Sequence, residues 1–104
     1  MVQISNDPSI ESTLLEHSKI IIKFYADWCG NCKLFSPKYR RLSEDPHFEG
    51  ILFLDINAEE NELSRNLAGV NNLPFFAVFK NGVLVEGTAT SLEDNVVELL
   101  NKLN

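Results

Sequence analysis

Residues 19–26 constrain the fold more than any other part of the chain. They read Lys-Ile-Ile-Ile-Lys-Phe-Tyr-Ala, a nearly continuous run of β-branched and aromatic side chains without regular polar alternation. Such a run is typical of a strand covered on both faces, as in a parallel or mixed sheet between helices. The chain therefore needs a layer of helices on each side of a central sheet.

The segments around this strand alternate between helical and extended patterns. Asp7 and Pro8 fit the start of a helix, with Asp7 as the N-cap and Pro8 in the first turn. Ile10, Leu14 and Leu15 give that helix one apolar face, which we expect to be buried. A short strand over residues 2–4 would precede it.

The remaining elements follow in the same alternation. Residues 51–56 predict a second buried strand, and residues 75–79 and 83–85 predict a hairpin closed by Asn81-Gly82. Helices are expected over residues 29–42, with a kink at Pro37, over residues 60–67, and from Ser91 onward. Asp94, three residues after Ser91, suggests a capping box for the last helix, whose apolar face is formed by Val96, Val97, Leu99, Leu100 and Leu103.

This order predicts an α/β fold with a central mixed sheet of four to five strands, flanked by helices on both faces. A length of 104 residues fits one domain over residues 1–104. The formal net charge of −6 argues against nucleic-acid binding, which calls for a basic face. No apolar stretch approaches the roughly 20 residues of a spanning helix, and residues 1–8 lack a signal-peptide pattern, so we expect a cytoplasmic protein without a membrane partner.

The segment Trp28-Cys29-Gly30-Asn31-Cys32 lies where the buried strand ends and a helix begins. A helix N-terminus stabilises a thiolate through its free N–H groups and its dipole, which favours Cys29 as a nucleophile. Cys32, three residues later, lies within bonding reach of Cys29. Gly30 keeps the turn between them small and open. The pair therefore fits disulfide exchange, with one attacking and one resolving thiol.

Three other interpretations of the two cysteines compete with this one. They could be buried and inert, they could form a purely structural disulfide, or they could be half of a zinc site. Inert cysteines fit poorly with a C-x-x-C pair beside a tryptophan at a strand-to-helix junction. A purely structural disulfide fits poorly with so short a loop in a reducing compartment. A zinc site needs further ligands, and His17 and His47 are single histidines with no paired spacing.

Four segments in order resemble the thioredoxin family over essentially the whole chain. They are residues 24–33 around the two cysteines, Pro37 five residues past Cys32, Leu73-Pro74, and residues 79–82 (Phe-Lys-Asn-Gly). The resemblance implies the thioredoxin fold. It also implies Cys29 as nucleophile, Cys32 as resolving thiol and Pro74 as a cis-proline facing them. Leu73 would offer backbone groups to an extended substrate, and Trp28 would belong to the docking surface with Gly30 and Asn31.

Three positions depart from the family pattern. Asn31 stands where the reductant members usually carry proline, a position that tunes the balance between dithiol and disulfide. Thr90 replaces a usual glycine near the substrate surface and could narrow docking. Lys23 replaces a usual buried aspartate that assists proton transfer from the resolving thiol.

Lys23 has two interpretations. Its stem could pack while the ammonium reaches water, or it could stay buried and modulate the ionisation of the cysteines, as a cation or as a neutral base. We include Lys23 among the candidate catalytic residues on the second interpretation.

The expected function is the reduction of protein disulfides through a Cys29/Cys32 dithiol, with the redox-active disulfide in place of any bound cofactor or metal. The resemblance implies an NADPH-dependent thioredoxin reductase as partner, and roles in electron transport and cell redox homeostasis. The alternatives are an oxidant or disulfide isomerase with a less reducing potential, and a non-catalytic interaction module that uses the same fold. Nothing in the sequence calls for more than a monomer.

Overall fold

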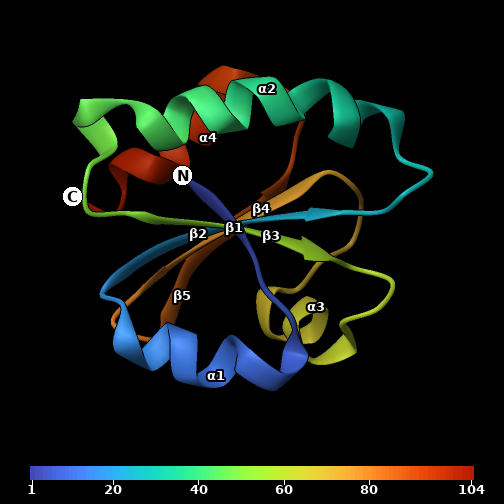
Figure 1. The fold of residues 1–104 in the computed structure, drawn as a ribbon, viewed down its shortest axis with the longest axis horizontal. Coiled ribbons are helices and arrows are strands. Elements are labelled where there is room, and N and C mark those ends of the chain that lie inside the picture. Colours follow the sequence, from blue (N-terminus) through green and yellow to red (C-terminus); the bar gives the residue numbers. More distant parts are fainter.

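A computed structural model describes residues 1–104 as a five-stranded sheet between two pairs of helices (Figure 1). The strands are β1 (Val2–Ile4), β2 (Lys19–Tyr25), β3 (Leu52–Asn57), β4 (Phe75–Lys80) and β5 (Val83–Ala89). The helices are α1 (Asp7–Glu16), α2 (Gly30–Glu44), α3 (Glu62–Ala68) and α4 (Glu93–Asn101), with a 3₁₀ turn at Pro46–Phe48. The predicted fold class is confirmed, including the short strand at the N-terminus.

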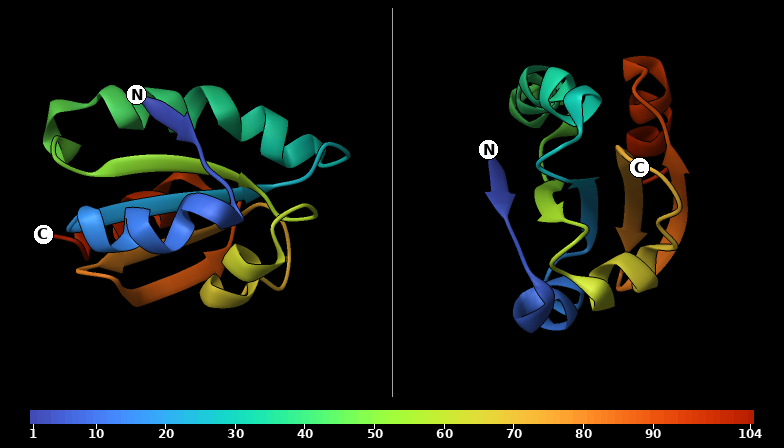
Figure 2. Two further views of the ribbon diagram at one scale, coloured as in Figure 1. Left: turned by 60° about the horizontal axis from the view of Figure 1, so that its bottom comes forward. Right: turned by 90° about the vertical axis from the view of Figure 1, so that its right-hand side faces the viewer.

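The sheet order is β1-β3-β2-β4-β5, which places β2 in the centre and leaves β1 and β5 at the two edges (Figure 2). β1, β3 and β2 run parallel, whereas β4 is antiparallel to β2 and β5 is antiparallel to β4. The hairpin between β4 and β5 turns at Asn81 and Gly82, both with positive φ, as an Asn-Gly hairpin requires. No helix of the chain combines the length and apolar character needed to cross a membrane.

Side chains of β2 alternate between the two helical layers. Ile20, Ile22 and Phe24 pack with α1 and α3, whereas Ile21 packs with α2 and α4. Figure 1 shows these layers on opposite sides of the sheet. The buried strand predicted from its continuous apolar run is therefore covered on both faces.

Several local predictions were wrong, and each failure has a physical reason. Asp7 is not an N-cap, because α1 begins at Asp7 after Asn6. The Asp7 carboxylate instead accepts hydrogen bonds from the N–H groups of Leu63 and Ser64 and from the Ser64 hydroxyl at the start of α3. Leu15 lies on the solvent side of α1, with 82% of its surface exposed.

The C-terminal part of the chain also differs from expectation. β5 runs to Ala89, four residues beyond the predicted end, because pairing with β4 continues to Phe75. α4 begins at Glu93, two residues later than expected, and no capping box forms at Ser91. The N-cap is Leu92, which forms no side-chain cap. The Thr90 hydroxyl ties this junction together instead, because it accepts hydrogen bonds from the Leu92 N–H (3.1 Å) and from the Asn95 side-chain amide (2.9 Å).

Candidate active site

Cys29 and Cys32 form a disulfide at the first turn of α2, with their Cα atoms 5.3 Å apart. The strand β2 ends at Tyr25, and the Cys29 N–H bonds back to the Ala26 carbonyl in a tight turn. α2 follows immediately and continues through Pro37 as one helix of 15 residues. The order of strand, turn and helix thus fixes both sulfurs at one end of the sheet.

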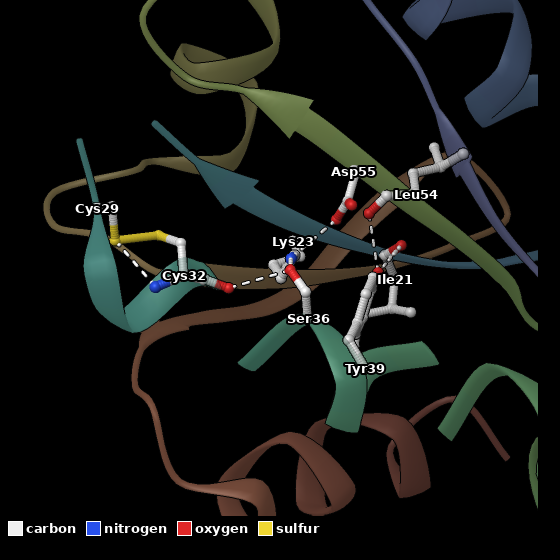
Figure 3. Close-up of polar contacts among 8 residues, drawn as sticks. All are labelled: Ile21, Lys23, Cys29, Cys32, Ser36, Tyr39, Leu54 and Asp55. Carbon is white, nitrogen blue, oxygen red and sulfur yellow. Dashed lines mark hydrogen bonds and ion pairs between the residues drawn. A yellow bond between two sulfur atoms is a disulfide. The ribbon is translucent and has the colours of Figure 1, made fainter. Parts of the chain in front are cut away.

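Cys29 is the N-cap residue of α2. Its Sγ accepts a hydrogen bond from the Cys32 N–H at 3.1 Å (Figure 3). The same N–H group and the positive end of the helix dipole would stabilise a thiolate on Cys29 after reduction. Both cysteines are nearly buried, so attack on a disulfide requires a partner that docks directly on this turn.

The surface beside the disulfide offers places for such a partner. Trp28 is 69% exposed, and its indole N–H donates to the Glu59 carboxylate at 2.8 Å. At Gly30 an added Cβ would meet nothing within 4 Å, so the turn next to the disulfide is open. The Leu73 side chain packs against the cluster formed by Ala26 and the two cysteines.

Two grooves flank Leu73. One, of about 300 Å³, lies between Trp28 and Arg65 and contains Leu73 and Val70 in its wall. The other, of about 210 Å³, brings Asn31, Leu73, Pro74 and Thr90 together. Five of the six residues predicted to bind substrate therefore line these two grooves, and the sixth, Gly30, lines neither.

The loop before β4 carries the backbone groups of this surface. The Leu73–Pro74 peptide bond is cis, and the Pro74 carbonyl accepts the Thr90 N–H at 3.1 Å. The Leu73 N–H donates to the side chain of Asn72 at 2.9 Å. A substrate strand that pairs with this N–H would first have to displace the Asn72 side chain.

The Lys23 side chain does not extend to the protein surface. It is 2% exposed, and its ammonium donates to the Ser36 hydroxyl at 2.8 Å and lies 3.4 Å from Asp55 Oδ1 (Figure 3). The interpretation in which its ammonium extends to solvent is therefore wrong. Burial lowers the pKa of Lys23, and the Asp55 carboxylate counteracts part of that shift.

Ser36 connects Lys23 to the cysteine turn. Its hydroxyl donates to the Cys32 carbonyl at 3.2 Å while accepting from Lys23. Asp55 faces Lys23 across the parallel pair of β2 and β3, and burial raises the pKa of its carboxyl despite the nearby Lys23 ammonium. Lys23 therefore lies behind the cysteines rather than on the docking surface.

Four residues of this site were not predicted from the sequence: Ser36, Asp55, Glu59 and Asn72. A signal for Asp55 was present, because it is the one charged residue inside the otherwise apolar run Ile-Leu-Phe-Leu-Asp-Ile of residues 51–56. A lone buried charge calls for a partner, and Lys23 is the matching charge on the neighbouring strand. Glu59 and Asn72 lie on loops, where no periodic pattern marks them. No group of three or more His, Cys, Asp or Glu side chains is arranged to hold a metal ion.

Comparison with known proteins places these features in a family. The thioredoxin family model matches residues 1–102. Thioredoxin-T of Drosophila melanogaster is 32% identical over 101 residues, a match that covers 97% of this chain and 64% of that protein. Thioredoxin H-type of Chlamydomonas reinhardtii is 31% identical over 87 residues, covering 84% of this chain and 76% of the relative.

Among solved structures, the short form of spinach chloroplast thioredoxin F superposes with a TM-score of 0.89 at 22% identity, covering 98% of this chain and 92% of that one. At 22% sequence identity, the superposition is evidence for a shared fold and for nothing further. The chain spans less than two thirds of the length of the Drosophila relative.

Proposed function

We propose that this chain, which belongs to the thioredoxin family, reduces disulfides in other proteins. Its domain is a thiol–disulfide oxidoreductase domain with Cys29 and Cys32 as the redox-active pair. One observation carries the proposal: Cys29 Sγ caps α2 and accepts the Cys32 N–H, at an open turn beside the exposed Trp28. This geometry favours the thiolate that disulfide exchange needs.

The exchange proceeds in two displacements. The Cys29 thiolate attacks one sulfur of a substrate disulfide, the substrate S–S bond breaks, and the other substrate sulfur leaves and takes up a proton. Cys32 then loses its proton and attacks Cys29 Sγ, which breaks the mixed disulfide and releases the second substrate thiol. Two electrons pass from the dithiol to the substrate, and Cys29 and Cys32 end as the disulfide seen in this structure.

The surface around the turn supports a role for the flanking residues in binding. We assign Trp28 and Leu73 to the groove that ends at Arg65, and Asn31, Pro74 and Thr90 to the second groove. Gly30 leaves the approach to Cys29 Sγ clear. Because the hydroxyl of Thr90 is engaged with Leu92 and Asn95, we expect its methyl group rather than its hydroxyl to meet a substrate.

The oxidised protein must be reduced again for turnover. We propose that an NADPH-dependent thioredoxin reductase supplies the two electrons, that the protein acts as a monomer, and that it works in the cytoplasm in electron transport and cell redox homeostasis. A compartment that keeps thiols reduced suits this direction of exchange. Steady consumption of NADPH with a thioredoxin reductase and an oxidised protein substrate, and a monomer mass by light scattering, would test these assignments.

The proposed function is tested with insulin as a disulfide substrate and dithiothreitol as reductant. The wild type is expected to accelerate reduction, whereas Cys29→Ser abolishes the acceleration. Cys32→Ser is expected to accumulate a mixed disulfide, visible by mass spectrometry, at Cys29. The chain has only two cysteines. Cys29→Ser, which keeps Cys32 and cannot form the mixed disulfide at position 29, is therefore the matched control. Full acceleration by the Cys29→Ser/Cys32→Ser double variant would overturn the proposal and favour a non-catalytic interaction module.

A further inference from the structure

The buried Lys23 and the half-buried Asp55 form a charged pair that the two displacements above do not use. They lie opposite each other on the parallel strands β2 and β3. Both point toward the layer of α2 and α4, on the same side of the sheet as Cys32 (Figure 3). Charged side chains in a core cost free energy unless they are paired and hydrogen-bonded, so their presence so close to a reactive thiol calls for an explanation.

A cavity of about 170 Å³ connects this pair with the redox site. Cys32 forms part of its wall together with Lys23, Ser36 and Asp55. The cavity is wide enough for water, and its walls carry the polar groups that hold water in proteins. A proton can therefore pass between Cys32 and Asp55 without crossing packed apolar side chains.

One oxygen of Asp55 is free to accept a proton. Oδ1 is buried and receives no hydrogen bond. The Lys23 ammonium lies 3.4 Å from it but directs its hydrogen bond to Ser36 at 2.8 Å. A buried carboxylate oxygen without a donor is poorly stabilised, and protonation relieves that penalty.

The charges around Asp55 set the balance between its two forms. Burial raises the pKa of this carboxyl, and the positive charges of Lys23 and Arg40 oppose that shift. The titratable and charged groups that surround it or line the same cavity are Lys23 and Tyr25 from β2, Tyr39, Arg40, Cys32 and Lys33 from α2, and Asp27 from the turn before α2. The Lys23 ammonium therefore stabilises the ionised carboxylate of Asp55, while burial raises the affinity of that carboxylate for a proton.

We propose that Asp55 accepts the proton of Cys32 when the mixed disulfide is resolved, with Lys23 and Ser36 as positioning residues that hold the pair beside the cavity. The proposal rests on the proposed function and names the proton acceptor for its second displacement. The Cys32 S–H bond breaks and its proton moves through the cavity to Asp55 Oδ1. The sulfur electron pair forms the bond to Cys29 Sγ, and the bond between Cys29 and the substrate breaks. The substrate sulfur leaves with that bond's electron pair, and Asp55 returns its proton to solvent.

The two displacements can be timed separately by stopped flow. Reduced protein is mixed with excess dithiobis(nitrobenzoate), so that Cys29 attack releases one coloured thiolate and resolution by Cys32 releases a second. The second leaving group needs no proton near neutral pH, so its release isolates the loss of the Cys32 proton. Asp55→Asn is compared with the wild type from pH 6 to 10. Asp27→Asn, the same change in an exposed carboxylate at the same cavity, is the matched control.

A proton acceptor and a purely electrostatic role predict opposite signs. Loss of a negative charge near Cys32 would by itself favour the Cys32 thiolate and speed the second release. Loss of the acceptor instead slows the second release in Asp55→Asn by on the order of tenfold or more at pH 7. The difference disappears above about pH 8.5, where a thiol ionises without help. The first release and the behaviour of Asp27→Asn are expected to stay as in the wild type.

The outcomes separate this proposal from the proposed function. A second release that is unchanged or faster in Asp55→Asn, or a slowing that appears in Asp27→Asn instead, would overturn the role of Asp55. Absence of the first release in the wild type would count against disulfide exchange at Cys29 itself.

If Asp55→Asn does not fold, the carboxyl ¹³C signal of Asp55 is followed by NMR against pH. The oxidised wild type is compared with the Cys29→Ser variant, in which Cys32 is a free thiol. The proposal requires that the Asp55 titration shift between these two forms, and identical titration curves would overturn it.

Discussion

On the face of the sheet covered by α1 and α3, a hydrophobic cluster of twelve buried side chains runs from Ile10 on α1 to Phe79 on β4. The buried polar side chains at α3, Asn61 and Ser64, are uncharged. The face covered by α2 and α4 also has a cluster of twelve buried side chains. There, however, the same central strands carry Lys23 and Asp55 at positions where strict alternation calls for apolar side chains. The two clusters are equal in size and differ in the charges placed beside one of them.

The difference follows from the position of the disulfide. α2 begins at the redox site and lies on the charged face, where Ser36 joins Lys23 to the Cys32 carbonyl. A buried ion pair is seldom more stabilising than apolar residues of similar volume, so stability does not account for this one. Both apolar clusters therefore hold the fold together, and the α2 and α4 face in addition connects the core to the thiol chemistry.

The largest effect on stability is expected on the apolar face. Phe24→Ala removes a fully buried ring that packs edge-on against Phe75, and we expect a loss of about 3–5 kcal/mol in the free energy of unfolding. The rates of the two displacements in the folded fraction stay as in the wild type. Urea unfolding at pH 7 and stopped flow at low temperature check the two parts. A large change in the rate of the second displacement would contradict the assignment of the thiol chemistry to the α2 and α4 face.

A smaller loss is expected when one charge is removed from the other face. Lys23→Met leaves Asp55 without its counter-ion, which costs about 1–3 kcal/mol at pH 7 because the carboxylate is only partly exposed. The double variant Lys23→Met/Asp55→Asn removes the unpaired charge and is expected to recover to within about 1 kcal/mol of the wild type. Urea unfolding of the wild type, both single variants and the double variant measures this cycle.

The pH dependence of the Lys23→Met deficit has a definite sign. Burial raises the pKa of Asp55 above its ordinary value of 3.8, so its ionisation costs native stability as pH rises from 3.8 through the folded pKa. Without Lys23 that cost is larger. The deficit relative to the wild type is therefore expected to grow as pH rises through this range and to shrink as pH falls toward 3.8. A deficit independent of pH would show that lost packing, and not lost charge, is responsible.

A contact between helices of the apolar face gives the next effect. Asp7 caps α3 from α1, and Asp7→Ala is expected to cost about 1–2 kcal/mol. Burial pushes the pKa of Asp7 upward, but the hydrogen bonds from Ser64 and Leu63 outweigh it and the pKa is lowered from 3.8. This contribution is present above pH 3.8 and is lost as pH falls through the folded pKa. If the difference in the free energy of unfolding between the wild type and Asp7→Ala stays constant down to pH 2, this prediction is contradicted.

The smallest effect is expected at Leu15. Although it lies on α1, its side chain is exposed, so Leu15→Gln changes the free energy of unfolding by less than about 0.5 kcal/mol. Leu14→Ala, one residue earlier and buried in the apolar cluster, is the matched comparison and is expected to cost about 2–5 kcal/mol. Equal losses in thermal unfolding for the two variants would contradict the orientation of α1.

Sequence patterns predict what depends on neighbours along the chain. The alternation of elements, the buried strand over residues 19–26 and the Asn81-Gly82 turn each rest on a local signal, and the structure contains all three. The cysteine turn is also local, since a strand, a tight turn and a helix meet within a few residues. Its placement at the start of α2 followed directly from the sequence.

Contacts between residues far apart in the chain could not be predicted from local sequence patterns. Asp7 carries the signal of an N-cap for its own helix, yet it caps a helix that begins 55 residues later. Lys23 could be given its partner only once the register of β2 against β3 was known. Leu15 fits an apolar helical face by spacing alone, and only the packing of α1 on the sheet decides that Leu14 is the buried member.

The reduction potential of the Cys29–Cys32 pair tests the proposed function most directly. It is measured by equilibration with glutathione buffers, with the fluorescence of Trp28, the one tryptophan of the chain, as the signal. A protein-disulfide reductase is expected at or below about −230 mV, toward the value of about −270 mV for thioredoxin. A potential above about −200 mV would contradict the account and show that Asn31 and the buried Lys23–Asp55 pair tune the site for oxidation or isomerisation.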